Sequence, residues 1–107
     1  MTTARFTASF ITMQKRAARA LVRFCSEHRC EHPAMARLRD CLTALEAEDA
    51  ERAYLAFKAV PLGGAGHLSD WKPPPLPERE DAQYADVVFH ALVHYWSYAM
   101  NLMKARA

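Results

Sequence analysis

The stretch REDAQYADVVFHALVHYWSYAMNLMK, residues 79–104, decides the fold of this chain. Apolar residues recur along it every three or four positions. They are Ala85, Val88, Phe89, Leu92, Trp96, Ala99, Met100 and Met103. Because an α-helix turns once every 3.6 residues, this spacing gathers them into one stripe. The stretch is therefore predicted to be a long amphipathic helix with one face in a core.

Three further helices are predicted ahead of it, over about 7–30, 33–47 and 50–60. Each shows a shorter apolar stripe at helical spacing. Pro33 separates the first from the second, because proline disfavours helical geometry at the residue before it. Asp49 is a good N-cap for the third. The prediction is an all-α fold, a compact four-helix domain spanning 1–107. Its first three helices run up, down and up, and the last packs across their apolar faces.

The segment 61–78 is predicted to be a long ordered loop before the last helix. Its glycines and its five prolines forbid a continuous helix. It also carries apolar side chains of its own, which a flexible linker would lack. These are Leu62, Leu68, Trp71 and Leu76. The glycines, Gly63, Gly64 and Gly66, fail the tests for a phosphate-binding loop, because no strand precedes them and prolines follow.

Composition indicates an ordinary globular protein, with 51% hydrophobic and 24% charged residues among 107. Three cysteines are an odd number, which favours reduced thiols in the cytosol. No apolar run approaches the roughly 20 residues that span a bilayer, and residues 1–19 do not read as a secretory signal. We therefore expect a soluble, cytoplasmic protein with no membrane partner.

Charge is distributed unevenly along the chain, although the net charge is only +2. Residues 1–40 hold eight Lys or Arg against three acids, and residues 41–107 hold six against nine. The two parts therefore carry formal charges of +5 and −3. The outer face of the first helix gathers part of this positive charge. This asymmetry is too modest to predict a nucleic-acid binder.

Two pairs of residues are weak candidates for metal ligands. Cys25 and His28 lie near the end of the first helix, and thiolate and imidazole are ligands that zinc prefers. His90 and His94 are four residues apart on the last helix, a spacing that lets two imidazoles hold one ion. In both cases structural roles are favoured: a buried thiol with polar neighbours at a helix end, and two surface histidines.

Catalysis is not predicted. No serine, cysteine or aspartate stands in a recognisable nucleophile motif, and no carboxylate pair stands out from the solvated acids. The glutamate of a metalloprotease helix is missing, because Ala91, Leu92 and Val93 lie between the two histidines. We therefore expect a protein that is not an enzyme and that holds no cofactor.

The stretch from about Leu42 to Met103 resembles a family of small, uncharacterised bacterial helical proteins, a domain of unknown function. In that family a Pro-x-Gly-Gly-Met-Gly turn leads to Asn-Asp-Trp and then to a helix with Tyr, Phe and Trp. This chain departs from the pattern at Ala65 and at Ser69. The resemblance implies a companion of a toxin or of another larger protein. The residues that carry it are Val60, Pro61, Gly63, Gly64, Ala65, Gly66, Asp70, Trp71, Tyr84, Phe89, Leu92 and Trp96.

A candidate binding face lies opposite the apolar stripe of the last helix. A purely solvated face would carry Lys and Glu there, whereas this one offers histidines, an aromatic, an amide and an apolar residue. Its residues are Val87, His90, His94, Tyr98 and Asn101. The preceding loop is expected to border the same patch through His67, Asp70 and Trp71. The alternative is that the first helix or the loop covers this face and makes it a second core surface.

The leading hypothesis is a small non-catalytic protein-binding module, an immunity-type or regulatory partner of a larger bacterial protein. Its partner would be a toxin or other protein, or a second copy of the same chain as a homodimer. The first alternative is a small metal- or ligand-binding protein that uses the His and Cys clusters. The second is a nucleic-acid-binding regulator.

Overall fold

The computed structural model describes residues 2–60 and 67–106, with their side chains at 10–60 and 67–102. Four α-helices and one short 3₁₀ turn, η1, make up its regular structure, and these described ranges contain no strand. The all-α, four-helix prediction is therefore confirmed. The elements are α1 (Thr2–Glu27), α2 (Met35–Glu46), α3 (Ala50–Lys58), η1 (Leu68–Asp70) and α4 (Ala82–Arg106).

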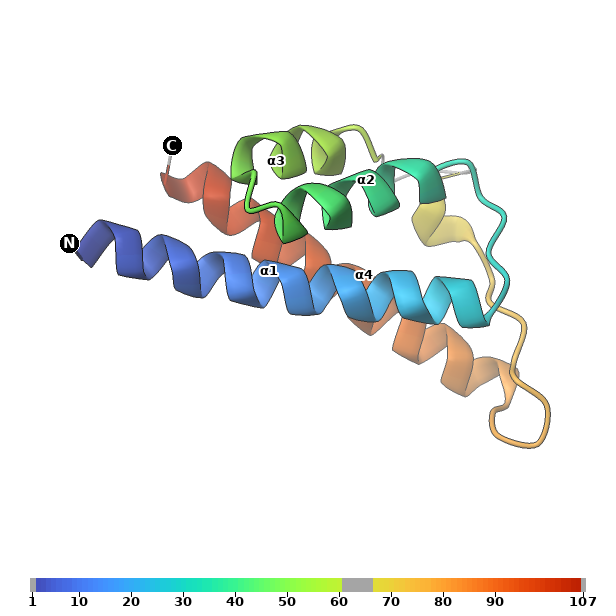
Figure 1. Ribbon diagram of the computed structural model, residues 1–107. Helices are drawn as coiled ribbons and strands as arrows, with labels where there is room; N and C mark the ends of the chain where they lie inside the picture. The colour runs from blue at the N-terminus through green and yellow to red at the C-terminus, as the bar shows by residue number, and fades with distance from the viewer. Residues whose placement is uncertain (1, 61–66, 107) are drawn as a thin grey trace.

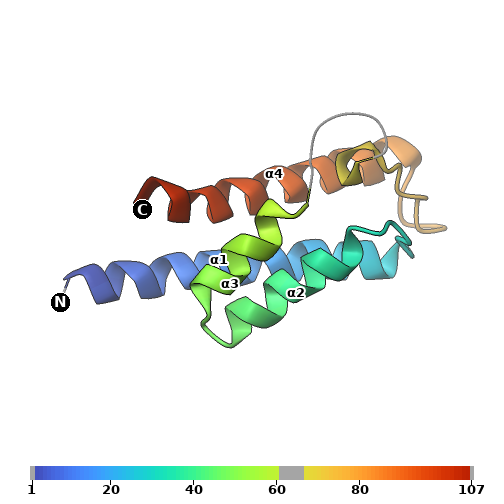
Figure 2. The ribbon, with the colours of Figure 1, turned by 90° about the horizontal axis from the view of Figure 1, so that it is seen from above.

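The helices form two layers (Figures 1 and 2). The two long helices, α1 and α4, lie side by side and antiparallel in one layer, and the short α2–α3 hairpin covers them in the other. The molecule is elongated along the long helices, with extents of 49 × 26 × 21 Å. The predicted up-down-up order of the first three helices is confirmed. The last helix packs chiefly along α1 and meets α3 near its C-terminal half.

Aromatic rings join the two layers and the loop into one core. The rings of Phe57 on α3 and Trp96 on α4 meet edge to face, with centroids 5.0 Å apart. Phe89 on α4 stacks on Phe24 of α1 at 6.1 Å and receives the edge of Trp71 at 5.0 Å. Such contacts add stabilisation to that of the buried apolar area. The largest fully buried side chains are Trp96, Phe89, Leu21, Leu38, Leu45, Leu68 and Met100.

One buried amide crosses the contact between the two long helices. Gln14 of α1 is fully buried, and its Nε2 donates a hydrogen bond of 3.0 Å to the backbone oxygen of Ala99 in α4. Its Oε1 has no hydrogen-bond partner. Because a buried polar group without its bonds is destabilising, this contact favours one alignment of α1 along α4 over its neighbours.

Two helices end in a left-handed residue that is not glycine. At the end of α1, Arg29 has φ 55°, and the N–H of Cys30 bonds to the oxygen of Cys25 at 2.8 Å. At the end of α2, Glu48 has φ 58°, and Asp49 closes the corresponding bond. This pattern satisfies carbonyls that a helix end leaves without partners. It ends α1 at Glu27, three residues earlier than the sequence predicted.

Other helix bounds also differ from the prediction. α1 begins at Thr2 instead of near residue 7, and α4 begins at Ala82 instead of residue 79. Asp49 caps α3 as expected, accepting the N–H of Arg52 at 3.1 Å. The predicted turn at Gly63, Gly64 and Gly66 lies outside the described residues. Within the described part of the chain, no helix has the length and apolar character needed to cross a membrane.

Candidate protein-binding face

The outer face of α4 is exposed along its length. Tyr84, Val87 and Tyr98 are 56%, 60% and 57% exposed, which is unusual for large apolar or aromatic side chains. His90, His94 and Asn101 are exposed on the same side. The alternative that another part of the chain buries this face is therefore wrong for these residues.

This face is almost free of charge. Asp86 is the single charged residue between positions 82 and 103, and it lies beside Lys72 (3.9 Å) and the ring of His90 (3.4 Å). α4 holds its inner face in the core through Phe89, Val93 and Trp96, so its outward direction is fixed by packing. A helix in free contact with water usually carries Lys and Glu outside, and charged residues are depleted in the centre of protein interfaces.

The loop before α4 borders the face as predicted, although its residues contribute unequally. The backbone oxygen of Ser69 lies 3.2 Å from Nε2 of His90, which places η1 against the first half of α4. Asp70 is exposed, whereas His67 and Trp71 are half-buried. The indole of Trp71 packs on Phe89 and therefore serves the core more than a partner.

The histidine pair on α4 is poorly prepared to hold a metal ion. Nδ1 of His90 lies 2.9 Å from the backbone oxygen of Asp86, and its Nε2 faces Ser69. Each ring nitrogen of His90 therefore faces a backbone oxygen, and among the described residues neither His67 nor Asp70 joins His94 in a group of ligands. Among the described residues, no group of three or more His, Cys, Asp or Glu side chains is arranged to hold a metal.

Cys25 and His28 also have structural surroundings. Burial raises the pKa of the Cys25 thiol to about 12, with the neighbouring Cys30 adding to the effect. Burial likewise raises the pKa of Cys41, to about 11. A thiol with so high a pKa remains protonated near neutral pH, whereas metals and electrophiles react with the thiolate. The predicted role of Cys25 as a small buried side chain therefore fits its position.

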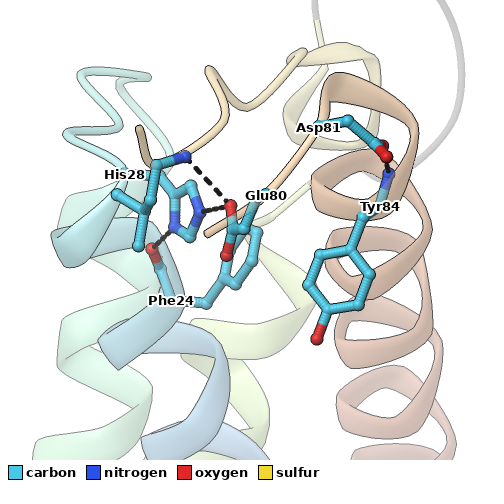
Figure 3. A network of polar contacts seen from close by, with 6 residues as sticks. Phe24, His28, Glu80, Asp81 and Tyr84 are labelled. Atoms are coloured by element: carbon cyan, nitrogen blue, oxygen red, sulfur yellow. Dashed lines mark hydrogen bonds and ion pairs between the residues drawn. The ribbon is translucent and has the colours of Figure 1, made fainter. Parts of the chain in front are cut away.

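A polar contact that the sequence did not predict joins the end of α1 to the start of α4 (Figure 3). His28 stacks on the ring of Phe24 at 3.8 Å and is buried, its side chain 1% exposed. Its Nδ1 lies 2.8 Å from the backbone oxygen of Phe24, and its Nε2 lies 2.7 Å from Oε1 of Glu80. The same Oε1 accepts the N–H of Leu76 at 3.1 Å.

The geometry of this contact requires a shared proton. A carbonyl oxygen only accepts, so Nδ1 of His28 must donate to Phe24. Nε2 and the carboxylate oxygen of Glu80 can then approach to 2.7 Å only with a proton between them. The hydrogen bond from His28 lowers the pKa of Glu80 below its ordinary range, with the Leu76 amide acting in the same direction. The pair therefore ties two chain segments together.

The N-terminus of α4 lies directly after Glu80 in the chain. Asp81, next to Glu80, accepts the N–H of Tyr84 at 2.7 Å and caps the helix (Figure 3). The helix starts at Ala82, directly after this cap. The cap leaves the ring of Tyr84 exposed at the beginning of the binding face.

The basic outer face of α1 differs from the face of α4 because most of its charge is paired. Lys15 lies 3.7 Å from Glu48, Arg19 lies 3.2 Å from Glu46, and Arg23 lies 3.2 Å from Glu27. Acids of α1, of α2 and of the turn after α2 thus accompany the positive charges that the sequence gathers here. These surface pairs partly neutralise the basic face.

Comparisons with models of protein families, with curated proteins and with solved structures find no match. The resemblance to a family of small bacterial helical proteins therefore stays a prediction. Its most specific part, the turn at Gly63, Gly64, Ala65 and Gly66, lies outside the described residues.

Proposed function

We propose that this chain is a non-catalytic protein-binding module of the bacterial cytosol, whose partner is another protein, in an immunity-type or regulatory role, or a second copy of the same chain. It binds through the outer face of α4. The observation that carries the proposal is an exposed helical face on a stretch, residues 82–103, that contains a single charged residue. Tyrosine and histidine supply rigid contact area with polar ends, which suits an interface better than open solvent.

The surroundings of the other reactive side chains support a non-catalytic role. His28 and His90 have both ring nitrogens engaged, and Cys25 and Cys41 have raised pKa values. A general base or nucleophile needs a free, activated atom. The metal-binding and nucleic-acid-binding alternatives gain no support from the described residues, for the reasons given above.

Two substitutions on the face test the proposal. His94→Glu introduces a charge, and Tyr98→Ala removes a large exposed ring. Because both side chains are exposed, both variants are expected to fold like the wild type, as judged by circular dichroism and thermal unfolding. Both should lose most of the protein that co-purifies with the wild type, or most of its self-association.

Ala36→Glu, an exposed position near the start of α2, is the matched control for an added charge. It should retain all binding. If His94→Glu and Tyr98→Ala fold normally and still bind everything that the wild type binds, the proposed face is wrong.

A further inference from the structure

Six exposed residues of α4 follow a period of 3.5 residues. Their successive spacings are three, four, three, four and three positions, the pattern along which two helices pack as a coiled coil. We call this row the α4 seam. It consists of Tyr84, Val87, Ala91, His94, Tyr98 and Asn101, all exposed. It lies opposite the buried stripe and has no covering element among the described parts of the chain.

The edges of the seam are uncharged as well. Gln83, His90 and Ser97 lie along one side, and Val88 and Tyr95 along the other. A shallow hollow lies along one side of the seam, lined by His90, Ala91, Val93, His94 and Ser97.

We infer that the α4 seam binds a second copy of this chain, with the two α4 helices antiparallel about a two-fold axis between residues 92 and 93. The inference rests on the proposed function, because it names the partner of the same face. In this arrangement Tyr84 faces Asn101, Val87 faces Tyr98 and Ala91 faces His94, each pair being formed twice. The seam is therefore complementary to itself, as a two-fold interface requires.

Side-chain size favours the antiparallel order. Each pair joins a larger side chain to a smaller one: Tyr84 to Asn101, Tyr98 to Val87, and His94 to Ala91. A parallel order would instead oppose identical residues, so that tyrosine would meet tyrosine and alanine would meet alanine. The helices would then be pushed apart at some levels and leave gaps at others, which close packing disfavours.

Charge favours a second copy over a charged partner. A partner with Lys, Arg, Asp or Glu at its centre would have to desolvate those charges against a seam that offers no counter-charge. A second α4 seam presents the same uncharged row. Asp86 lies off the seam, beside Lys72 and His90, and does not enter the contact.

The expected dimer is weak. The seam runs for about 26 Å along the helix axis, and a helix pair of this length buries on the order of 1,000 Å² in total, the lower limit of specific interfaces. A Kd in the micromolar range is therefore expected. Sedimentation velocity between about 1 and 200 µM covers this range, and the mass should rise from 12.1 kDa toward twice that value.

Charge substitution separates the antiparallel order from other contacts. Val87→Glu and Tyr98→Lys should each raise the Kd roughly tenfold or more by burying an unpaired charge. In the double variant, Glu at 87 faces Lys at 98 of the partner subunit, and two ion pairs form. The double variant should therefore dimerise at least about fivefold more tightly than either single variant. Ala36→Glu should dimerise like the wild type.

The outcomes test three parts of the inference separately: the second copy as partner, the antiparallel order of the helices, and the seam as the interface. A chain that remains monomeric at about 200 µM overturns the second copy as partner. The proposed function still stands in that case if His94→Glu and Tyr98→Ala abolish capture of another protein. A dimer in which the double variant is no tighter than the single ones overturns the antiparallel order. A dimer that neither single substitution weakens overturns the seam as its interface.

Discussion

The two long helices pack against each other through apolar inner faces, but their outer faces differ in charge. α1 and α4 have 26 and 25 residues and pack antiparallel, each with an apolar inner stripe. The outer face of α1 carries Lys15, Arg19 and Arg23, each with an acidic partner. The outer face of α4 carries tyrosines and histidines with a single acid. The outer face of α1 therefore meets charged groups of this same chain, whereas the outer face of α4 has few charged groups to pair with.

The largest effect on stability is expected on the buried inner stripe, a feature that the two long helices share. Trp96→Ala should lower the free energy of unfolding by about 4 kcal/mol, because it empties a fully buried site against Phe57. Tyr98→Ala, two residues away on the outer face, should change it by less than about 0.5 kcal/mol. Chemical denaturation of both variants measures the difference. Equal effects would contradict the assignment of inner and outer faces.

A smaller effect on stability, dependent on pH, is expected at the contact between His28 and Glu80, which joins α1 to the segment before α4. The pKa of Glu80 is lowered in the folded protein from an ordinary value of 4.5. The ionised carboxylate therefore contributes stability that is fully present above the ordinary value and is lost as pH falls through the lowered pKa. Glu80→Gln should be less stable than the wild type above about pH 5, and the difference should narrow as pH falls toward 3.

Unfolding titrations at several pH values test this tie. Glu78→Gln, an exposed position in the same segment, controls for the loss of one carboxylate. A gap between wild type and Glu80→Gln that widens on acidification would show that the contact between His28 and Glu80 is not the source of the effect.

The smallest effect is expected at the helix ends, where α1 stops at a left-handed Arg29. Glycine adopts this geometry without steric strain, so Arg29→Gly should raise the free energy of unfolding by about 0.5–1 kcal/mol. The same change at Arg37, inside α2, should lower it by about 1 kcal/mol, because glycine is unfavourable within a helix. Thermal unfolding distinguishes the two signs. A loss of stability in Arg29→Gly would contradict the assigned cap.

The sequence predicted the parts of the fold that depend on periodicity and on local caps. The stripe of α4, the helix break at Pro33 and the cap at Asp49 each follow from neighbouring residues. The end of α1 was predicted three residues too late, because Arg29 carries no local sign of a left-handed conformation. The start of α4 was placed three residues early, because acids at 78, 80 and 81 give similar local signals and Asp81 is the one that caps the helix.

The candidate face was predicted from spacing, since its exposure follows once the opposite stripe is buried. The buried polar contacts of Gln14 and His28, which hold α4 in place, were not predicted. Gln14 shares the apolar stripe of α1 by its helical spacing from Ala17 and Leu21, but its bond to Ala99 cannot be predicted from that spacing. His28 was expected among polar residues at a helix end, whereas Phe24 and the segment before α4 enclose it. Pairings between distant segments leave no signal in a single sequence.

The buried amide of Gln14 has a consequence for how tightly α4 can bind. Rotation or sliding of α4 against α1 would break the bond to Ala99 and leave both polar groups in the core. The backbone of the binding face is therefore held in place before any partner arrives. Association then restricts mainly side chains, and a tyrosine has only two rotatable angles to lose. The entropy lost on binding is small for this reason, which allows even a short contact to be specific.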